Sequence, residues 1–180
     1  MYRHLTGRRR LVPVSEEEKK KMAKNILVAV FSASGVTERV GREIARIAGA
    51  DFYEIVPKDI YTSADLDWNN RRSRSSIEMN DPSARPEIAG DALDMASYDT
   101  VIVGFPIWWG VAPRIIDTFL ESYDFSGKKI VPFCTSGGSG VGRSDKALHK
   151  DVSGDVKWAK GRQINRPNEA EIRRWLDEVL

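Results

Sequence analysis

The chain contains one cysteine, Cys134, and two histidines among its 180 residues. A single cysteine cannot form an internal disulfide or a multi-cysteine metal site, and scarce cysteine fits a reducing compartment. The sequence also lacks any run of about 18 uninterrupted apolar residues, which a membrane-spanning helix requires. We therefore expect a cytoplasmic protein that does not act at a membrane.

The net charge is small, at +2, but it is unevenly distributed along the chain. Residues 1–24 hold eight Lys or Arg against three Glu, which leaves 20 basic and 23 acidic residues, a net charge of −3, for the rest. The arginines at 8–10 are not followed by the apolar segment of about 7 to 15 residues that an export signal needs. Short basic ends are usually solvated, so no nucleic-acid partner is predicted. We interpret residues 1–23 as a flexible basic extension and residues 24–180 as one domain.

Short apolar runs rich in Val and Ile alternate with segments of helical period. Most of these runs show little polar alternation, which is typical of strands buried on both faces of a parallel sheet. The predicted strands are Ile26–Phe31, Phe52–Val56, Val101–Phe105, Ile130–Phe133 and a fifth within Val156–Ile164. The predicted helices are Val36–Ala48, Pro113–Ser122 and one from Glu169 to Val179 that Asn168 caps. This alternation predicts a doubly wound sheet that binds ligands beyond the carboxyl ends of its strands.

The segment from Pro57 to about Pro86 departs from this pattern, because it shows no sustained helical period. Its first half is polar and turn-like around one large aromatic residue, Trp68. A loop of this length inside a compact domain is usually either functional or disordered. We therefore predict an irregular segment over Tyr61–Arg85, without a helix.

The loop after the first predicted strand carries three hydroxyls and one glycine between Ser32 and Thr37. A helix amino terminus offers unpaired N–H groups and a partial positive charge, to which hydroxyls add further donors. This pattern predicts a phosphate site, although a Ser/Thr helix cap with a glycine turn explains the same residues. The loop contains no Lys or Arg, which favours neutral donors around a monoester phosphate.

The loop after the third predicted strand holds Trp108 and Trp109 between Pro106 and Gly110. Large aromatic side chains are costly to expose, so we expect one tryptophan to pack against the protein and the other to face a planar ring. The loop after the fourth predicted strand, over residues 135–144, is rich in glycine and serine. Its backbone groups suit the polar edge of a heterocycle.

Two other interpretations of this last segment are weaker. Gly137–Ser144 reads G-x-x-x-x-G-R-S, one residue away from the nucleoside triphosphate loop, but Arg143 stands where that loop has lysine. A phosphatase with Cys134 as its nucleophile would need an arginine closer in sequence than Arg143. We therefore expect Cys134 to lie in the core. The sequence shows no group of residues with the spacing of a metal site, so no metal is predicted.

The hydroxyl-rich, aromatic and glycine-rich loops together make the chain resemble the flavodoxin family, in its short-chain type, over Lys24–Leu180. The resemblance implies a flavodoxin-like three-layer α/β/α sandwich with a five-stranded parallel sheet in the order 2-1-3-4-5, and FMN as cofactor. It implies a phosphate site formed by Ser32, Ala33, Ser34, Gly35, Val36 and Thr37. It also implies a flavin ring lined by Pro106, Ile107, Trp108, Trp109 and Gly110, with Ser136, Gly137, Gly138 and Ser139 along its other edge and Trp68 closing over the site.

The resemblance further implies a low-potential electron-transfer protein with redox protein partners, present as a monomer or a weak homodimer. The alternative on the same fold is an NAD(P)H-dependent quinone or flavin reductase, and the sequence leaves both open. Two departures from the family stand out. The loop after the fourth strand has no aromatic residue, and the net charge of −3 is less acidic than that of many flavodoxins, which leaves the charge of the partner open.

Overall fold

The computed structural model describes residues 25–152 and 154–180, and the predicted extension over residues 1–23 lies outside this range. The strands are β1 (Ile26–Val30), β2 (Asp51–Glu54), β3 (Thr100–Pro106), β4 (Lys129–Thr135), β5 (Lys157–Trp158) and β6 (Arg162–Gln163). The helices are α2 (Val36–Ala48), α3 (Arg74–Asn80), α4 (Arg114–Glu121), α5 (Ser144–Leu148), α6 (Glu169–Val179) and the short 3-10 helix η1 (Met95–Ser97).

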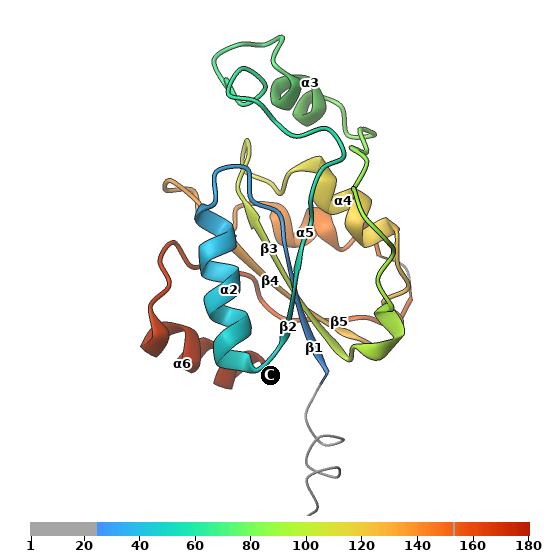
Figure 1. The fold of residues 1–180 in the computed structure, drawn as a ribbon, viewed down its shortest axis with the longest axis vertical. Coiled ribbons are helices and arrows are strands. Elements are labelled where there is room, and N and C mark those ends of the chain that lie inside the picture. Colours follow the sequence, from blue (N-terminus) through green and yellow to red (C-terminus); the bar gives the residue numbers. More distant parts are fainter. Residues whose placement is uncertain (1–24, 153) are drawn as a thin grey trace, which may run out of the picture.

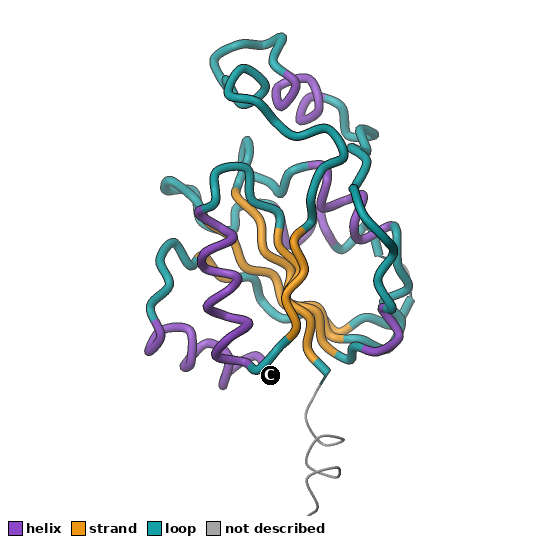
Figure 2. Tube along the Cα trace, in the orientation of Figure 1, coloured by secondary structure: helices purple, strands orange, loops and turns teal. Residues whose placement is uncertain are grey.

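The strands form one parallel sheet in the order β2-β1-β3-β4-β5, which confirms the predicted order. Helices α2 and α6 cover one face of the sheet, and α4 and α5 cover the other (Figures 1 and 2). Successive residues of β1 alternate between the two cores, with Ala29 facing Phe119 and Leu148 on one side and Val28 facing Ile44 on the other. The central strands are therefore buried on both faces, as their unbroken apolar runs predict.

The fifth position of the sheet holds two short strands rather than the single strand predicted within Val156–Ile164. β5 pairs with Lys129 and Ile130 of β4, whereas β6 pairs with its Phe133 and Cys134. On β4, the carbonyls of Ile130 and Cys134 accept hydrogen bonds from the outer segment that contains β5 and β6. Backbone groups two residues apart on a strand point the same way, so those of Pro132, midway between these two residues, also face the outer segment. Proline has no N–H to donate, and the outer strand is therefore interrupted where β4 offers no ladder donor.

Residues 57–89 form a flap above the carboxyl ends of the strands, with α3 at its top (Figure 1). Its base is closed by two backbone hydrogen bonds, from Lys58 N–H to Glu87 O and from Ala89 N–H to Val56 O, both 2.8 Å long. The expectation of no helix here was wrong. The residues that α3 buries are Ser75 and Ser76, so the helix has no apolar stripe that a periodicity search would detect.

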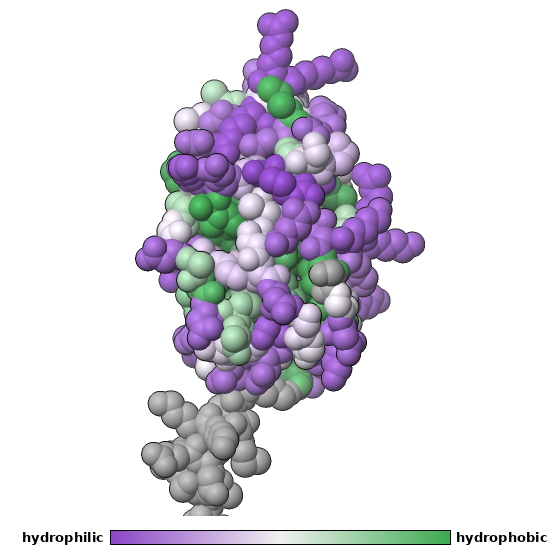
Figure 3. Space-filling view, turned by 90° about the vertical axis from the view of Figure 1, so that its right-hand side faces the viewer, coloured by the Kyte–Doolittle hydropathy of each residue, from purple (hydrophilic) through white to green (hydrophobic). Residues whose placement is uncertain are grey.

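Within the described part of the chain, no helix is both long and apolar enough to cross a membrane. Hydrophilic side chains cover most of the face that Figure 3 shows, and the apolar areas on that face are separate from one another. Scattered apolar groups of this kind are ordinary on a protein surface.

Candidate functional site

Two of the three predicted loops meet in one pocket of about 450 Å³ at the carboxyl edge of the sheet. The loop after β1 contributes Ala33 and Ser34, and the loop after β3 contributes residues 106–109. The flap contributes Leu66, Trp68 and Ser75. The walls are thus mainly apolar and aromatic, with a few hydroxyls at defined places, as small-molecule sites generally are.

The loop from Ser32 to Thr37 presents hydrogen-bond donors that lack protein acceptors. Ser32 Oγ is buried and has no hydrogen-bond partner among the described residues. No side chain among the described residues caps the amino end of α2, and the N–H groups of Val36, Thr37 and Glu38 have no acceptor there. An anion fits this position, because it accepts hydrogen bonds from both the hydroxyl and the helix amino terminus.

Thr37, another predicted phosphate residue, uses its hydroxyl in a contact within the protein. The side chain is buried, and its Oγ1 lies 2.8 Å from Thr135 Oγ1 at the end of β4. This hydrogen bond joins the loop after β1 to the beginning of the glycine-rich loop. The Thr37 hydroxyl therefore fixes the position of the phosphate loop.

The aromatic loop is a tight turn centred on Trp109 and Gly110. Trp108 N–H donates to Val111 O at 2.9 Å, and Val111 N–H donates to Trp108 O at 3.1 Å. The two central residues have φ values of 48° and 80°, the signs found in a type I′ turn. Trp109 is the only described non-glycine residue with positive φ, a conformation that costs about 1 kcal/mol. Such strain tends to persist where the strained residue has a function.

The two tryptophans of this turn divide as expected, one packed and one exposed. Trp108 lies edge-on to Phe31 and Tyr61, with ring centroids 5.6 Å and 5.4 Å apart. Trp109 is 46% exposed and lines the pocket. Of the two tryptophans, Trp109 is therefore the more accessible to a bound ring.

Hydrogen bonds of Ser136 and Asn165 organise the glycine-rich loop. Ser136 was among the predicted site residues, whereas Asn165 was not. Ser136 N–H donates to Asn165 Oδ1, and Asn165 Nδ2 donates to Ser136 O, both at 2.9 Å. Ser136 Oγ accepts the N–H groups of Gly138 and Ser139. Residues 136–139 do not line the pocket, but they begin beside it because Thr135 pairs with Pro106. Asn165 stands in a loop with no motif, so only the fold reveals its contact.

The glycine-rich loop also supports the aromatic turn from behind. Arg143 N–H donates to Gly110 O at 3.0 Å, and Arg143 Nη2 donates to Trp109 O at 3.3 Å. A Cβ atom at Gly142 would lie 2.5 Å from Gly110 O, and Gly142 has φ +61°, so this close approach needs glycine. Arg143 thus contacts a carbonyl of the neighbouring loop, whereas a nucleoside triphosphate loop would direct this residue to its ligand.

Tyr61 joins the flap to the rest of the domain, because its ring lies edge-on to Phe31, with the ring centroids 5.9 Å apart. Within the flap, the Tyr61 hydroxyl donates to Glu78 Oε2 at 2.5 Å, and the Arg74 guanidinium lies 4.0 Å from the centroid of the Tyr61 ring. Burial and the Glu78 carboxylate raise the pKa of Tyr61 far above its usual range, so the hydroxyl stays a donor. Trp68 lines the pocket yet is 72% exposed, so it covers the pocket only in part.

Cys134 lies in the core, as predicted. The side chain is fully buried on β4. Burial, and next the Asp145 charge, raise the pKa of the thiol to about 12. The thiol is therefore neutral at physiological pH, and a phosphatase that uses it as a thiolate nucleophile is excluded.

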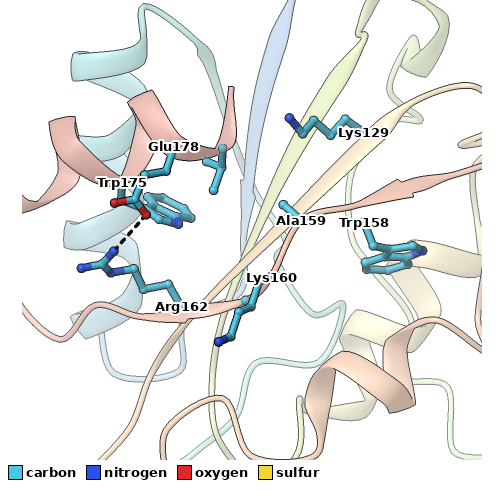
Figure 4. Close-up of a pocket in the computed structure, with 9 residues that line it drawn as sticks. Lys129, Trp158, Ala159, Lys160, Arg162, Trp175 and Glu178 are labelled. Atoms are coloured by element: carbon cyan, nitrogen blue, oxygen red, sulfur yellow. Dashed lines mark ion pairs between the residues drawn. The ribbon is translucent and has the colours of Figure 1, made fainter.

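A second pocket, of about 680 Å³, lies at the outer edge of the sheet beside β5, β6 and α6. Figure 4 shows Lys129, Lys160 and Arg162 around it, with Arg162 Nη1 lying 3.7 Å from Glu178 Oε2. None of the residues predicted to bind a cofactor lines this pocket. We therefore place the candidate site at the carboxyl edge of the sheet.

A doubly wound sheet in this order, with an anion loop after β1 and an aromatic loop after β3, defines the flavodoxin-like class of α/β proteins. The sequence model of the family described as flavodoxin matches residues 25–179. The chain therefore belongs to the flavodoxin family. No curated protein matches it.

Several solved structures are similar to this chain. A Bacteroides eggerthii protein assigned as a flavoprotein is 52% identical, with 86% of this chain and 97% of that chain covered and a TM-score of 0.81. A Bacteroides uniformis protein with the same assignment is 44% identical, with coverages of 86% and 98% and a TM-score of 0.81. A Lactobacillus acidophilus flavoprotein, solved in complex with FMN, is 22% identical, with coverages of 85% and 99% and a TM-score of 0.63, and it supports the fold.

Proposed function

We propose that this protein binds FMN at the carboxyl edge of the sheet and transfers electrons between redox proteins. The observation that carries the proposal is one pocket that joins an anion loop without lysine or arginine to aromatic walls. FMN consists of a flat ring and a single phosphate. The buried Ser32 Oγ, which has no partner among the described residues, fits the phosphate of such a ligand.

The residues of the pocket divide into those for the phosphate and those for the ring. Ser32 and the first-turn N–H groups of α2 would hold the phosphate, since they are donors without acceptors. Trp109 and Ile107 would line the ring, while Trp108 keeps their turn against the core through Phe31. When bound, FMN supplies the capacity to accept and release electrons, and the protein supplies binding, orientation and access.

The lining of the pocket favours an electron carrier over a reductase. Among the described residues, no titratable side chain lines the pocket. An enzyme that reduces a quinone by two electrons must also deliver protons, and a positioned acid is the usual means. A carrier needs only an accessible ring edge, which the partly exposed Trp109 and Trp68 leave available.

Stopped-flow reduction of the FMN-loaded protein tests the choice between carrier and reductase. The protein is mixed with NADPH, with and without a soluble quinone, and the flavin absorbance is followed. We expect slow reduction by NADPH and no quinone turnover, but rapid oxidation of the dithionite-reduced protein by one-electron acceptors. Rapid reduction by NADPH with quinone turnover would overturn the carrier proposal in favour of the reductase.

A further inference from the structure

A concave basic surface lies directly beside the candidate flavin site. This surface surrounds a hollow of about 590 Å³, separate from both pockets described above, which Trp109 and the end of α3 also line. We call its four basic residues the cationic surface: Arg114, Arg143, Lys146 and Lys150. Trp109 lines both this hollow and the pocket of the candidate flavin site, so a molecule on the cationic surface lies one side chain away from the flavin site.

The protein leaves most of this positive charge unpaired. Lys146 and Lys150 are exposed and form no ion pair with any described residue. Among residues 25–152 and 154–180, the side chain of Arg143 donates only to the Trp109 carbonyl, whereas Arg114 Nη1 lies 3.3 Å from Asp117 Oδ2. Residues at spacings of three and four share one side of a helical turn, so the unpaired charges repel one another. An external anion would relieve that repulsion.

The acidic residue within α5 does not neutralise the cationic surface. Asp145 Oδ2 accepts the Gly161 N–H at 3.4 Å, and Gly161 lies on the outer-strand side of α5. Asp145 therefore turns toward the sheet edge, away from Trp109. The side of α5 that faces the flavin site remains cationic.

Exposed hydrophobic side chains gather at the same edge of the molecule. The exposed large hydrophobic residues of the described chain are Val36, Ile60, Trp68, Ile77 and Trp109. All belong to the start of α2, the flap or the aromatic loop, which together surround the site. Aromatic and arginine side chains with a polar rim are the composition of protein interfaces.

We propose that the cationic surface docks an acidic redox protein and brings its redox centre next to Trp109. The inference rests on the proposed electron-transfer function. A protein fits better than a small anion, because the unpaired charges and the exposed hydrophobic side chains extend over α5, the aromatic loop and the flap. Opposite charges across such an interface steer the encounter and fix its orientation.

A matched pair of protein probes tests the sign of the charge. Native cytochrome c is basic, and exhaustively succinylated cytochrome c is acidic with the same haem. Binding of each to the FMN-loaded protein is measured by biolayer interferometry at ionic strengths from about 20 to 300 mM. The oxidation rate of the dithionite-reduced protein by each probe is followed by stopped flow. At low salt we expect the acidic probe to bind at least about tenfold more tightly than the basic one, with an advantage that salt removes.

The double variant Lys146→Glu/Lys150→Glu locates the effect. It should reverse the preference between the two probes, whereas the control Lys157→Glu/Lys160→Glu makes the same charge change at the outer sheet edge and should retain it. An equal loss of affinity for the acidic probe in both variants, or tighter binding of the basic probe by the wild type, would overturn the proposed docking surface. Neither result would contradict the proposed electron-transfer function. If the acidic probe binds as expected but neither cytochrome is reduced at any ionic strength, the proposed function fails, and electron exchange at this surface fails with it.

Discussion

Gly142→Ala probes the contact that joins the glycine-rich loop to the aromatic turn. The new Cβ would lie 2.5 Å from Gly110 O, at a φ of +61° that side chains rarely adopt. The left-handed conformation costs about 1 kcal/mol. Moving the loop to relieve the clash would also break the hydrogen bond from Arg143 N–H to Gly110 O, worth about 1 kcal/mol. We therefore expect the free energy of unfolding to fall by about 2 to 3 kcal/mol.

Gly140→Ala is the matched control for this variant. Gly140 has φ +64°, but the nearest atom to its added Cβ, Gln163 Oε1, lies 3.7 Å away. The control should therefore lose only the conformational contribution of about 1 kcal/mol. Urea unfolding of the apoprotein, followed by circular dichroism, measures both variants. Equal losses would refute the reasoning that the Gly142 contact ties the two loops together.

Three further predictions concern the flap, a buried carboxyl pair and the strained turn. Tyr61→Phe keeps the ring contact with Phe31 but removes the donor to Glu78 within the flap, so hydrogen exchange in the flap should accelerate, and unchanged exchange would show that this hydrogen bond does not stabilise the flap. Burial, and next the charge of Asp117, raise the pKa of Asp151 to about 7 in the folded protein. The protonated carboxyl therefore contributes fully to stability below the pKa of about 3.9 that it has in the unfolded chain, and this contribution is lost as pH rises through 7. Asp151→Asn should therefore flatten the dependence of unfolding free energy on pH between about 4 and 7, and a persistent slope would contradict this assignment. Trp109→Asn should leave the free energy of unfolding unchanged or raise it by up to about 1 kcal/mol, because Asn tolerates positive φ. The same variant should weaken FMN binding by about 0.5 to 1.5 kcal/mol, and unchanged FMN affinity in calorimetry would show that Trp109 does not contact the ring.

The central strands could be predicted because they carry their own signal, whereas the order of the sheet followed from the resemblance to the flavodoxin family. β1 and β3 are buried on both faces, so their sequences are unbroken apolar runs such as Ile26–Val30. The outer strands have weaker signals, since β5 and β6 hold two residues each. Their division follows from Pro132 on the neighbouring strand, a contact between distant parts of the sequence that local patterns do not encode.

The sequence predicts the candidate site most directly where a single loop defines it. The local pattern from Ser32 to Thr37 predicts an anion site, because hydroxyls and a glycine precede an amphipathic helix. Contacts between loops were not predictable. Asn165 bonds to Ser136, and no motif marks Asn165. Arg143 stands in the glycine-rich loop, but its hydrogen bond to Trp109 O, 34 positions away, has no local signal. The short helix α3 was missed because it buries serines.

Calorimetric titration of the apoprotein with FMN and with riboflavin tests the central claim most directly, because the two ligands differ only in the phosphate. The wild type should bind FMN far more tightly than riboflavin. Ser32→Ala should weaken FMN binding by about 1.5 kcal/mol, roughly tenfold, through loss of a hydrogen bond to a charged group, and should leave riboflavin binding unchanged. Equal affinity of the wild type for both ligands, or an equal loss for both in Ser32→Ala, would contradict a phosphate site at the loop after β1.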